Sequence, residues 1–137
     1  MTTTTKTSKA MHISLWVVQA LLAAMFLMSG FMKASMPVEK LSAMLPWATS
    51  VPVALIKFIG LSELLGGLGL ILPSLLRFKP TLTIWAGLGL ATIMLLAIPF
   101  HISRGETPLI GMNAMFMILS LFVAWGRSKK APILPKS

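Results

Sequence analysis

Four long apolar runs divide the chain, and each is long enough to cross a membrane. They cover residues 13–32, 53–72, 82–100 and 108–125. Roughly 20 residues in a helix reach across the hydrocarbon core of a bilayer. A spanning segment must satisfy its own backbone hydrogen bonds, which a helix does. The sequence therefore predicts an all-α fold, an integral membrane four-helix bundle.

The composition agrees with a membrane class and excludes several functions. Only 11% of the 137 residues are charged and 56% are hydrophobic, whereas soluble domains carry about 25% charged residues. The chain has no Cys, which excludes thiol redox chemistry, disulfides and cysteine-bound metals. We expect one compact domain whose first partner is the lipid bilayer.

The basic residues predict the orientation of the bundle. Eight lie on the side of both termini and four on the opposite side, so the positive-inside rule places both termini in the cytoplasm. The net charge of +9 is thus explained by membrane orientation. No basic stripe is interleaved with aromatic residues, so we predict no nucleic-acid partner.

The domain organisation follows from these runs. Residues 1–11 are expected to form a disordered cytoplasmic tail, residues 12–127 the four-span membrane domain, and residues 128–137 a basic cytoplasmic tail that is disordered from 131. The second run is expected to end at Pro73, since proline interrupts helical hydrogen bonding. The first run is longer than the apolar core of a signal peptide and no cleavage site follows it, so it is expected to remain as a span.

The outer loop, residues 33–52, is the longest connection. Pro37 can open a short helix there, and the apolar residues after it can lie on the membrane surface. Two interpretations remain open: an interfacial connector, or a lid over the outer mouth of the bundle.

Glu63 is the most informative single residue, because it lies inside the second apolar run of a chain with three acidic residues. A carboxylate at the centre of a membrane costs about 2.5–3.5 kcal/mol on insertion scales. Lys57 lies on another helical face, so Lys33, Arg104 or Asn113 from other spans are the better partners. Glu63 is then either an interhelical ion pair or a carboxylate that binds a proton or a ligand.

Polar side chains gather in the predicted outer half of the bundle, whereas Gln19 is the main buried polar residue expected in the inner half. His101 can transfer protons near neutral pH, but no second His or Cys lies beside it, so no metal site is predicted. Each candidate also has a purely structural interpretation. His101 can be a hydrogen-bonded residue at the membrane interface, Arg104 and Glu106 can be charges at the rim of the bundle, and Asn113 can bond to a neighbouring helix. The candidate ligand-binding residues are Glu63, Lys33, His101, Arg104, Glu106, Asn113 and Gln19.

Small residues are placed to let the helices approach closely. Gly60, Glu63 and Gly67 share one face of the second span, and Gln19 and Gly30 share a stripe of the first. Small residues at such spacing favour close helix packing in membranes.

Several strings together resemble the DoxX-like family of small bacterial membrane proteins. The resemblance covers residues 15–127 and is strongest in IGLSELLGGLGLILP (residues 59–73) and AIPFHISRGE (residues 97–106). It implies a four-helix membrane bundle in the bacterial inner membrane. Some relatives are membrane subunits of thiosulfate:quinone oxidoreductase, which implies a quinone as cofactor and a polar site at the matching residues, but no defined reaction.

Three functions are consistent with the sequence. The first is a quinone-linked, redox-associated subunit with its ligand site in the outer half. The second is a non-catalytic partner or assembly subunit that holds another membrane protein through its glycine-lined faces and outer loop, and the same glycine faces also allow a homo-oligomer. The third is a small proton-coupled transporter, in which Glu63 would carry the proton. The sequence leaves open whether the protein is an enzyme.

Overall fold

The computed structural model describes residues 8–136, and within them four helices are long and apolar enough to cross a membrane. They are α1 (Lys9–Ser35), α3 (Val53–Leu76), α4 (Thr81–Arg104) and α5 (Thr107–Trp125). The first seven residues of the expected N-terminal tail lie outside the described part. Residues 9–11 of the expected tail instead form the first turn of α1. The Ser8 side chain caps this turn by accepting a hydrogen bond from the Met11 amide. The predicted all-α membrane bundle is confirmed.

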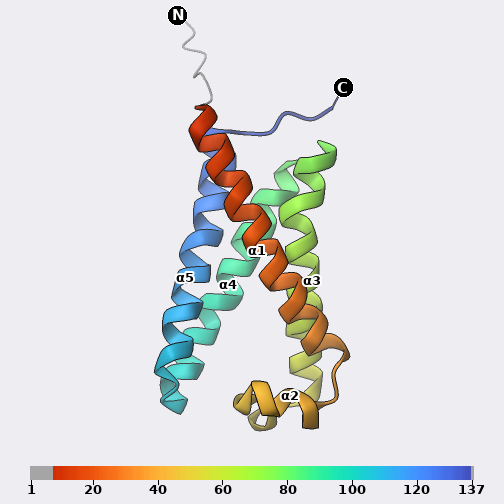
Figure 1. The fold of residues 1–137 in the computed structure, drawn as a ribbon, viewed down its shortest axis with the longest axis vertical. Coiled ribbons are helices and arrows are strands. Elements are labelled where there is room, and N and C mark those ends of the chain that lie inside the picture. Colours follow the sequence, from red (N-terminus) through yellow and green to blue (C-terminus); the bar gives the residue numbers. More distant parts are fainter. Residues whose placement is uncertain (1–7, 137) are drawn as a thin grey trace, which may run out of the picture.

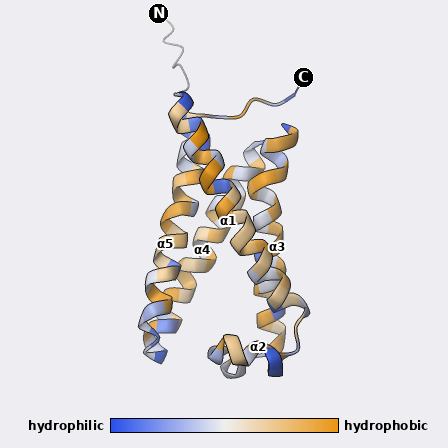
Figure 2. Cartoon of the chain, in the orientation of Figure 1, coloured by the Kyte–Doolittle hydropathy of each residue, from blue (hydrophilic) through white to orange (hydrophobic). Residues whose placement is uncertain are grey.

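The long helices alternate in direction between two ends of the bundle (Figure 1). We call the end with α2 (Val38–Met44), η1 (Pro46–Ser50) and the α4–α5 turn the lid end. The tail end contains the start of α1, the α3–α4 turn and η2 (Gly126–Lys130), a single π-helical turn after α5. Helix α1 packs mainly against α3, and α4 mainly against α5. Hydrophobic colours cover most of the helix length in Figure 2, as a lipid-facing surface requires.

One apolar core joins all four long helices. Leu22 and Phe26 of α1 meet Leu70 of α3, Leu90 of α4 and Val123 of α5. Each span presents only a narrow buried stripe to this core, and its remaining apolar residues are exposed to the surroundings. That distribution is typical of helices whose outer faces contact lipid tails.

A second apolar cluster closes the lid end. Leu41 of α2 and Trp47 of η1 pack with Ile56 of α3, and Phe100 and Leu109 of α4 and α5 lie against them. We call residues 38–50 the lid. It contacts all four spans, since Met32 of α1 also packs against the cluster.

Helix α3 does not end at Pro73, in contrast to the sequence-based expectation. It continues to Leu76 and ends at Arg77, which adopts a left-handed conformation. Proline at position 73 frees the carbonyl of Gly69, four residues earlier. The Thr83 hydroxyl of α4 donates a hydrogen bond of 2.9 Å to this carbonyl. A neighbouring helix therefore replaces the missing backbone bond, as membrane helices with internal proline require.

The segment from residue 131, which was expected to be disordered, follows a defined course in the structure. Residues 131–136 cross the tail end from α5 to α3, and we call them the strap (Figure 1). The Lys136 amide donates to the Arg77 carbonyl at 2.8 Å, and Arg77 Nε donates to the Leu134 carbonyl at 2.8 Å. Ala131 at its start is fully buried. These bonds give the strap a fixed position that its composition did not predict.

Candidate functional site

Glu63 forms a buried ion pair with Lys33. The carboxylate is 1% exposed, and its Oε1 and Oε2 lie 3.0 and 3.1 Å from Lys33 Nζ. The Ser29 hydroxyl donates a further bond of 2.9 Å to Oε1. Ser29 and Lys33 are four residues apart on α1, so both side chains face α3. Among the cations that the sequence left open, Lys33 is therefore the partner of Glu63.

Close backbone packing makes this pair possible. A Cβ atom added at Gly30 would lie 2.6 Å from the Gly60 carbonyl oxygen, and one at Gly60 would lie 2.6 Å from the Ala34 amide nitrogen. Only residues without a side chain allow α1 and α3 to approach this far. The predicted glycine faces are confirmed at this contact, which places Glu63 directly opposite Lys33 and Ser29.

A second polar cluster lies at the α4–α5 turn. His101 Nδ1 donates to Glu106 Oε1 at 2.9 Å, and Arg104 Nε donates to the same oxygen at 3.0 Å. Gly105, at φ of 70°, makes the turn that brings Glu106 back toward both donors. The hydrogen bond from His101, followed by the bond and charge of Arg104, lowers the pKa of Glu106 against an opposing effect of burial.

Trp47 of the lid lies between the two clusters. Lys33 Nζ is 5.6 Å from the centroid of its ring, within the range of a cation–π contact. The His101 ring meets the indole edge to face, with centroids 6.1 Å apart. The lid is also attached to the turn through Arg104 Nη1, which donates to the Ser50 hydroxyl. The two clusters and the lid thus form one site, which we call the lid-end site.

Two predicted residues, Asn113 and Gln19, lie outside this site. Asn113 of α5 is buried, and its Nδ2 has no hydrogen-bond partner within the described residues. Gln19 lies in the tail half, where its Nε2 donates to the Leu70 carbonyl. Arg104 pairs with Glu106 instead of Glu63. Lys57 donates to the Ala34 carbonyl at 3.1 Å.

Sequence reasoning missed two residues that organise the polar groups. They are Trp47, which the sequence pattern does not single out, and Arg127, one of the eight basic residues on the side of both termini. Arg127 is instead buried and donates to Gln19 Oε1 at 2.6 Å. A signal existed for Arg127: Gln19 lies on the buried stripe of α1, so its amide needed a polar partner from another helix.

A small cavity of about 100 Å³ adjoins the lid-end site beside Lys33. Its walls come from the end of α1, from the lid and from the start of α3, and they include Leu41, Ile56 and Lys57. Among the described residues, no group of three His, Cys, Asp or Glu side chains could hold a metal ion. The site offers an ammonium, an imidazole and an aromatic ring, which suit a planar ligand with oxygen acceptors.

The fold and the site define a class: a four-span, all-α membrane protein with a buried interhelical ion pair beneath a lid. The chain belongs to the DoxX-like family, whose family model matches residues 17–123. The match includes the Lys33–Glu63 pair, the lid and the α4–α5 turn. Comparisons with curated proteins and with solved structures gave no match.

Proposed function

We propose that the protein binds a quinone head group in the lid-end site, as a redox-associated subunit of a bacterial cytoplasmic membrane. In this proposal the tail end faces the cytoplasm and the lid end faces outward. The excess of basic residues at the tail end supports the orientation. Family membership supports a role in the membrane but leaves the ligand open.

The position of Trp47 is the observation that carries the proposal. A planar aromatic ring lies between the Lys33 ammonium, 5.6 Å from its centroid, and the His101 imidazole, 6.1 Å from it. A quinone head group is also a planar ring, with a carbonyl acceptor on each side. If it took the place of the indole, the Lys33 ammonium and the protonated form of His101 could each donate a hydrogen bond to one carbonyl.

Binding in this way requires the lid to move. Trp47 is buried, and neither it nor His101 lines the cavity of about 100 Å³ beside Lys33. A ring-sized ligand therefore has to displace Trp47 from its place. The apolar wall formed by Val53 and Ile56 leads from Lys33 along α3, and it suits the start of an isoprenoid tail.

His101 and Glu106 supply a route for protons. With Nδ1 donating to the Glu106 carboxylate, the other ring nitrogen of His101 can accept or donate a proton at the ligand. Glu106 lies in the turn at the lid end and is partly exposed. Reduction of a quinone consumes protons and electrons together. In this proposal the electrons come from a partner redox subunit and His101 exchanges the protons.

The test is direct identification of a bound quinone. The full chain is purified in mild detergent, its small molecules are extracted and identified, and a short-tailed quinone is titrated into it. His101→Gln should weaken binding on the order of fivefold, since it removes one hydrogen bond. Trp47→Leu should strengthen binding because the competing ring is gone.

Trp85→Leu is the matched control, because Trp85 is 67% exposed and lies near the start of α4, at the tail end. Its affinity for the quinone should equal that of the wild type. The proposal is wrong if no quinone co-purifies and none binds on titration, or if the three variants bind it equally.

A second function is favoured by the closed state of the Lys33–Glu63 pair. The carboxylate accepts bonds from Lys33 and Ser29 and is almost fully buried, so it has little capacity left for a ligand. A pair of this kind can fix the register of two helices in a partner or assembly subunit. Co-purification of one defined membrane protein, without any quinone, would support this alternative.

The proton-coupled transporter remains a prediction with less support. It needs Glu63 to meet a transported cation, but the Lys33 ammonium holds that position. Binding of a cation that depends on pH in the wild type and is lost in Glu63→Gln would support it.

A further inference from the structure

Arg127 is a buried cation whose contacts are all with neutral groups. Its side chain is 3% exposed at the start of η2. Nε donates to Gln19 Oε1 at 2.6 Å, and Nη1 donates to the Ala131 carbonyl at 2.9 Å. Nη1 also lies 3.0 Å from His12 Nδ1. Since a guanidinium can only donate, His12 must accept there and be neutral. Arg127 Cζ lies over the Trp16 ring, 5.4 Å from its centroid.

Part of the guanidinium lacks a partner among residues 8–136. Nη2 is buried and makes no hydrogen bond within the described residues. The chain has three acidic side chains, Glu39, Glu63 and Glu106. They belong to the lid, to the lid half of α3 and to the α4–α5 turn, so none can neutralise Arg127. A buried charge without a counter-ion is strongly unfavourable, which indicates that a further anion completes this site.

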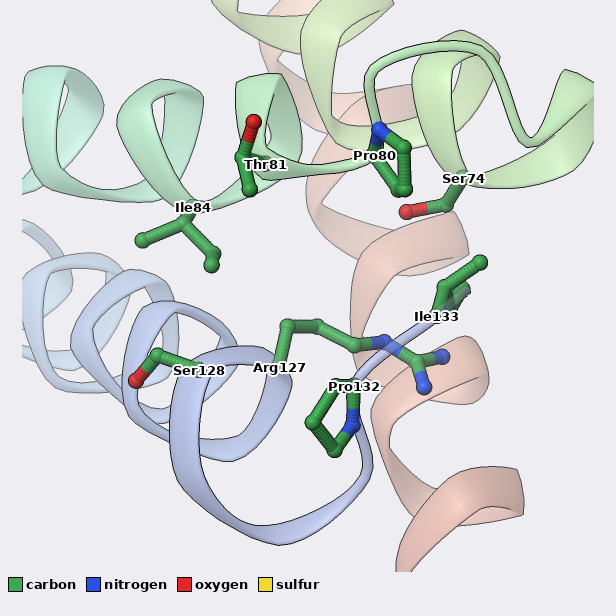
Figure 3. A pocket seen from close by; sticks show the side chains of 8 residues that line it. All are labelled: Ser74, Pro80, Thr81, Ile84, Arg127, Ser128, Pro132 and Ile133. Atoms are coloured by element: carbon green, nitrogen blue, oxygen red, sulfur yellow. The ribbon is translucent and has the colours of Figure 1, made fainter. Parts of the chain in front are cut away.

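A cavity of about 180 Å³ adjoins Arg127 at the tail end. Figure 3 shows the Arg127 side chain reaching along it from η2 toward Ile133 of the strap. Ser74, Thr81 and Ser128 bring hydroxyl groups to its wall. Thr81 is the first residue of α4, so the positive end of a 24-residue helix also lies there. A guanidinium, hydroxyls and a helix N-terminus together suit an oxyanion.

We propose that this cavity binds a phosphate group, with the Arg127 guanidinium as its central charge. The tail end is one end of four membrane-spanning helices, which is the depth of lipid head groups. Ile84 and Ile133 give the cavity an apolar part beside the polar one. That combination fits the phosphate and glycerol of an anionic phospholipid, and the same donors would hold free phosphate. This site is independent of the lid-end site and of its ligand.

The strap makes the site part of the fold. Pro132 and Ile133 form one wall of the cavity, and the Ala131 carbonyl accepts from Arg127. The strap is attached beyond them at Arg77, through the bonds of Leu134 and Lys136. An anion at Arg127 would therefore lie between the end of α5 and the strap, and would stabilise both.

The experiment uses the full chain, stripped of lipid in detergent and studied by native mass spectrometry and thermal unfolding. Three probes are added separately: phosphatidylglycerol, phosphatidylcholine and inorganic phosphate. Arg127→Gln should reduce binding of the preferred probe by about tenfold or more, because charge-assisted hydrogen bonds are lost. Lys130→Gln is the matched control: it removes the same charge from an exposed residue of η2 that does not line the cavity.

Ile133→Trp provides a second variant that leaves the charge in place. The larger side chain should fill the cavity from the strap and abolish binding, even if Arg127→Gln fails to fold. Preference for phosphatidylglycerol identifies a lipid as the source of the phosphate group. If inorganic phosphate stabilises the protein and displaces the lipid, the free ion is the source. Equal losses in Arg127→Gln and Lys130→Gln, or unchanged binding in Ile133→Trp, would overturn the proposal.

Discussion

The two ends of the bundle each bury a cation against a tryptophan, but they compensate its charge differently. At the lid end, Lys33 lies over Trp47 and is paired with Glu63. At the tail end, Arg127 lies over Trp16 and has only neutral partners. The charge of Lys33 is compensated within the chain, whereas Arg127 keeps one nitrogen, Nη2, without a hydrogen bond among the described residues.

This difference follows from the chemistry of lysine and arginine. Lysine is a compact point charge, and one carboxylate in good geometry satisfies it. Arginine has five donors in a fixed fork, so it can bond neutral groups on two sides and still present a free nitrogen. The lid end is therefore the more self-sufficient region, and the tail end the more dependent on what surrounds the protein.

The largest effect should come from breaking the pair at the lid end. Glu63→Ala leaves the Lys33 ammonium partly buried without a counter-ion, which should cost about 3–5 kcal/mol of unfolding free energy. Glu106→Ala should cost clearly less, because Glu106 is more accessible to water. Denaturant unfolding in detergent micelles measures both. Similar losses in the two variants would contradict the buried position of Glu63.

A rescue variant sharpens the same comparison. Replacing both partners, as Lys33→Met and Glu63→Met together, removes the charges without stranding either one. Stability should then return to near the wild-type value, since apolar replacements of buried pairs are often neutral.

Close backbone contact at the lid end should give the next largest effect. Gly30→Ala pushes a methyl group against the Gly60 carbonyl, which should destabilise the bundle by about 2 kcal/mol. Gly89→Ala is the control, because no atom lies within 4 Å of the added Cβ. It should gain about 0.5–1 kcal/mol from helix propensity. Thermal unfolding of both variants is the measurement, and equal behaviour would exclude the contact.

Removing the cation at the tail end should cost less than breaking the lid-end pair. Arg127→Met relieves a buried charge but strands two neutral acceptors, the Gln19 side chain and the Ala131 carbonyl. Because these effects oppose each other, we expect a loss of no more than about 1–2 kcal/mol. The measurement is denaturant unfolding of lipid-stripped protein. A loss as large as that of Glu63→Ala would show that the two ends are equally self-sufficient.

A smaller loss of stability is expected at the hydrogen bond from α4 to the free carbonyl of α3. Thr83→Val removes the donor to the Gly69 carbonyl and should cost about 1 kcal/mol. Thr92→Val is the matched control, since Thr92 bonds only to the Leu88 carbonyl of its own helix on an exposed face. Hydrogen exchange near Pro73 should increase in the first variant and stay unchanged in the second.

The smallest effect concerns pH and is confined to the lid end. Because the folded protein holds the pKa of Glu106 below its ordinary value of 4.5, its stabilising effect is fully present above about that pH. It is lost as the pH falls through the lower, folded pKa. Trp47 fluorescence should report loosening of the lid on acidification in the wild type, but the Glu106→Gln variant should lack this transition.

Much of the fold could be predicted because apolar runs and small residues act locally. The span lengths, the buried stripe of α1 and the shared face of Gly60 and Glu63 all follow from helical periodicity. Periodicity does not give distances between helices. The choice of Lys33 over Arg104 depended on which helices are neighbours, and that is a property of the whole bundle.

Two features could not be predicted because they depend on contacts distant in the chain. Pro73 is a helix breaker by local rules, and only Thr83 of the next helix makes continuation possible. Arg127 looks like any other cation of a basic tail, and only the position of Gln19 on α1 distinguishes it. In both places a polar group on one helix satisfies a group on another, which composition alone does not reveal.

The Lys33–Glu63 pair also constrains how the protein enters the membrane. Each partner comes from a different span, and a lone charge in the hydrocarbon region is costly for either helix. α1 leaves the ribosome well before α3, so its ammonium must remain near the surface until the carboxylate arrives. We therefore expect α1 to settle at its final depth only after α3 has been inserted, with these two helices integrating as one neutral hairpin.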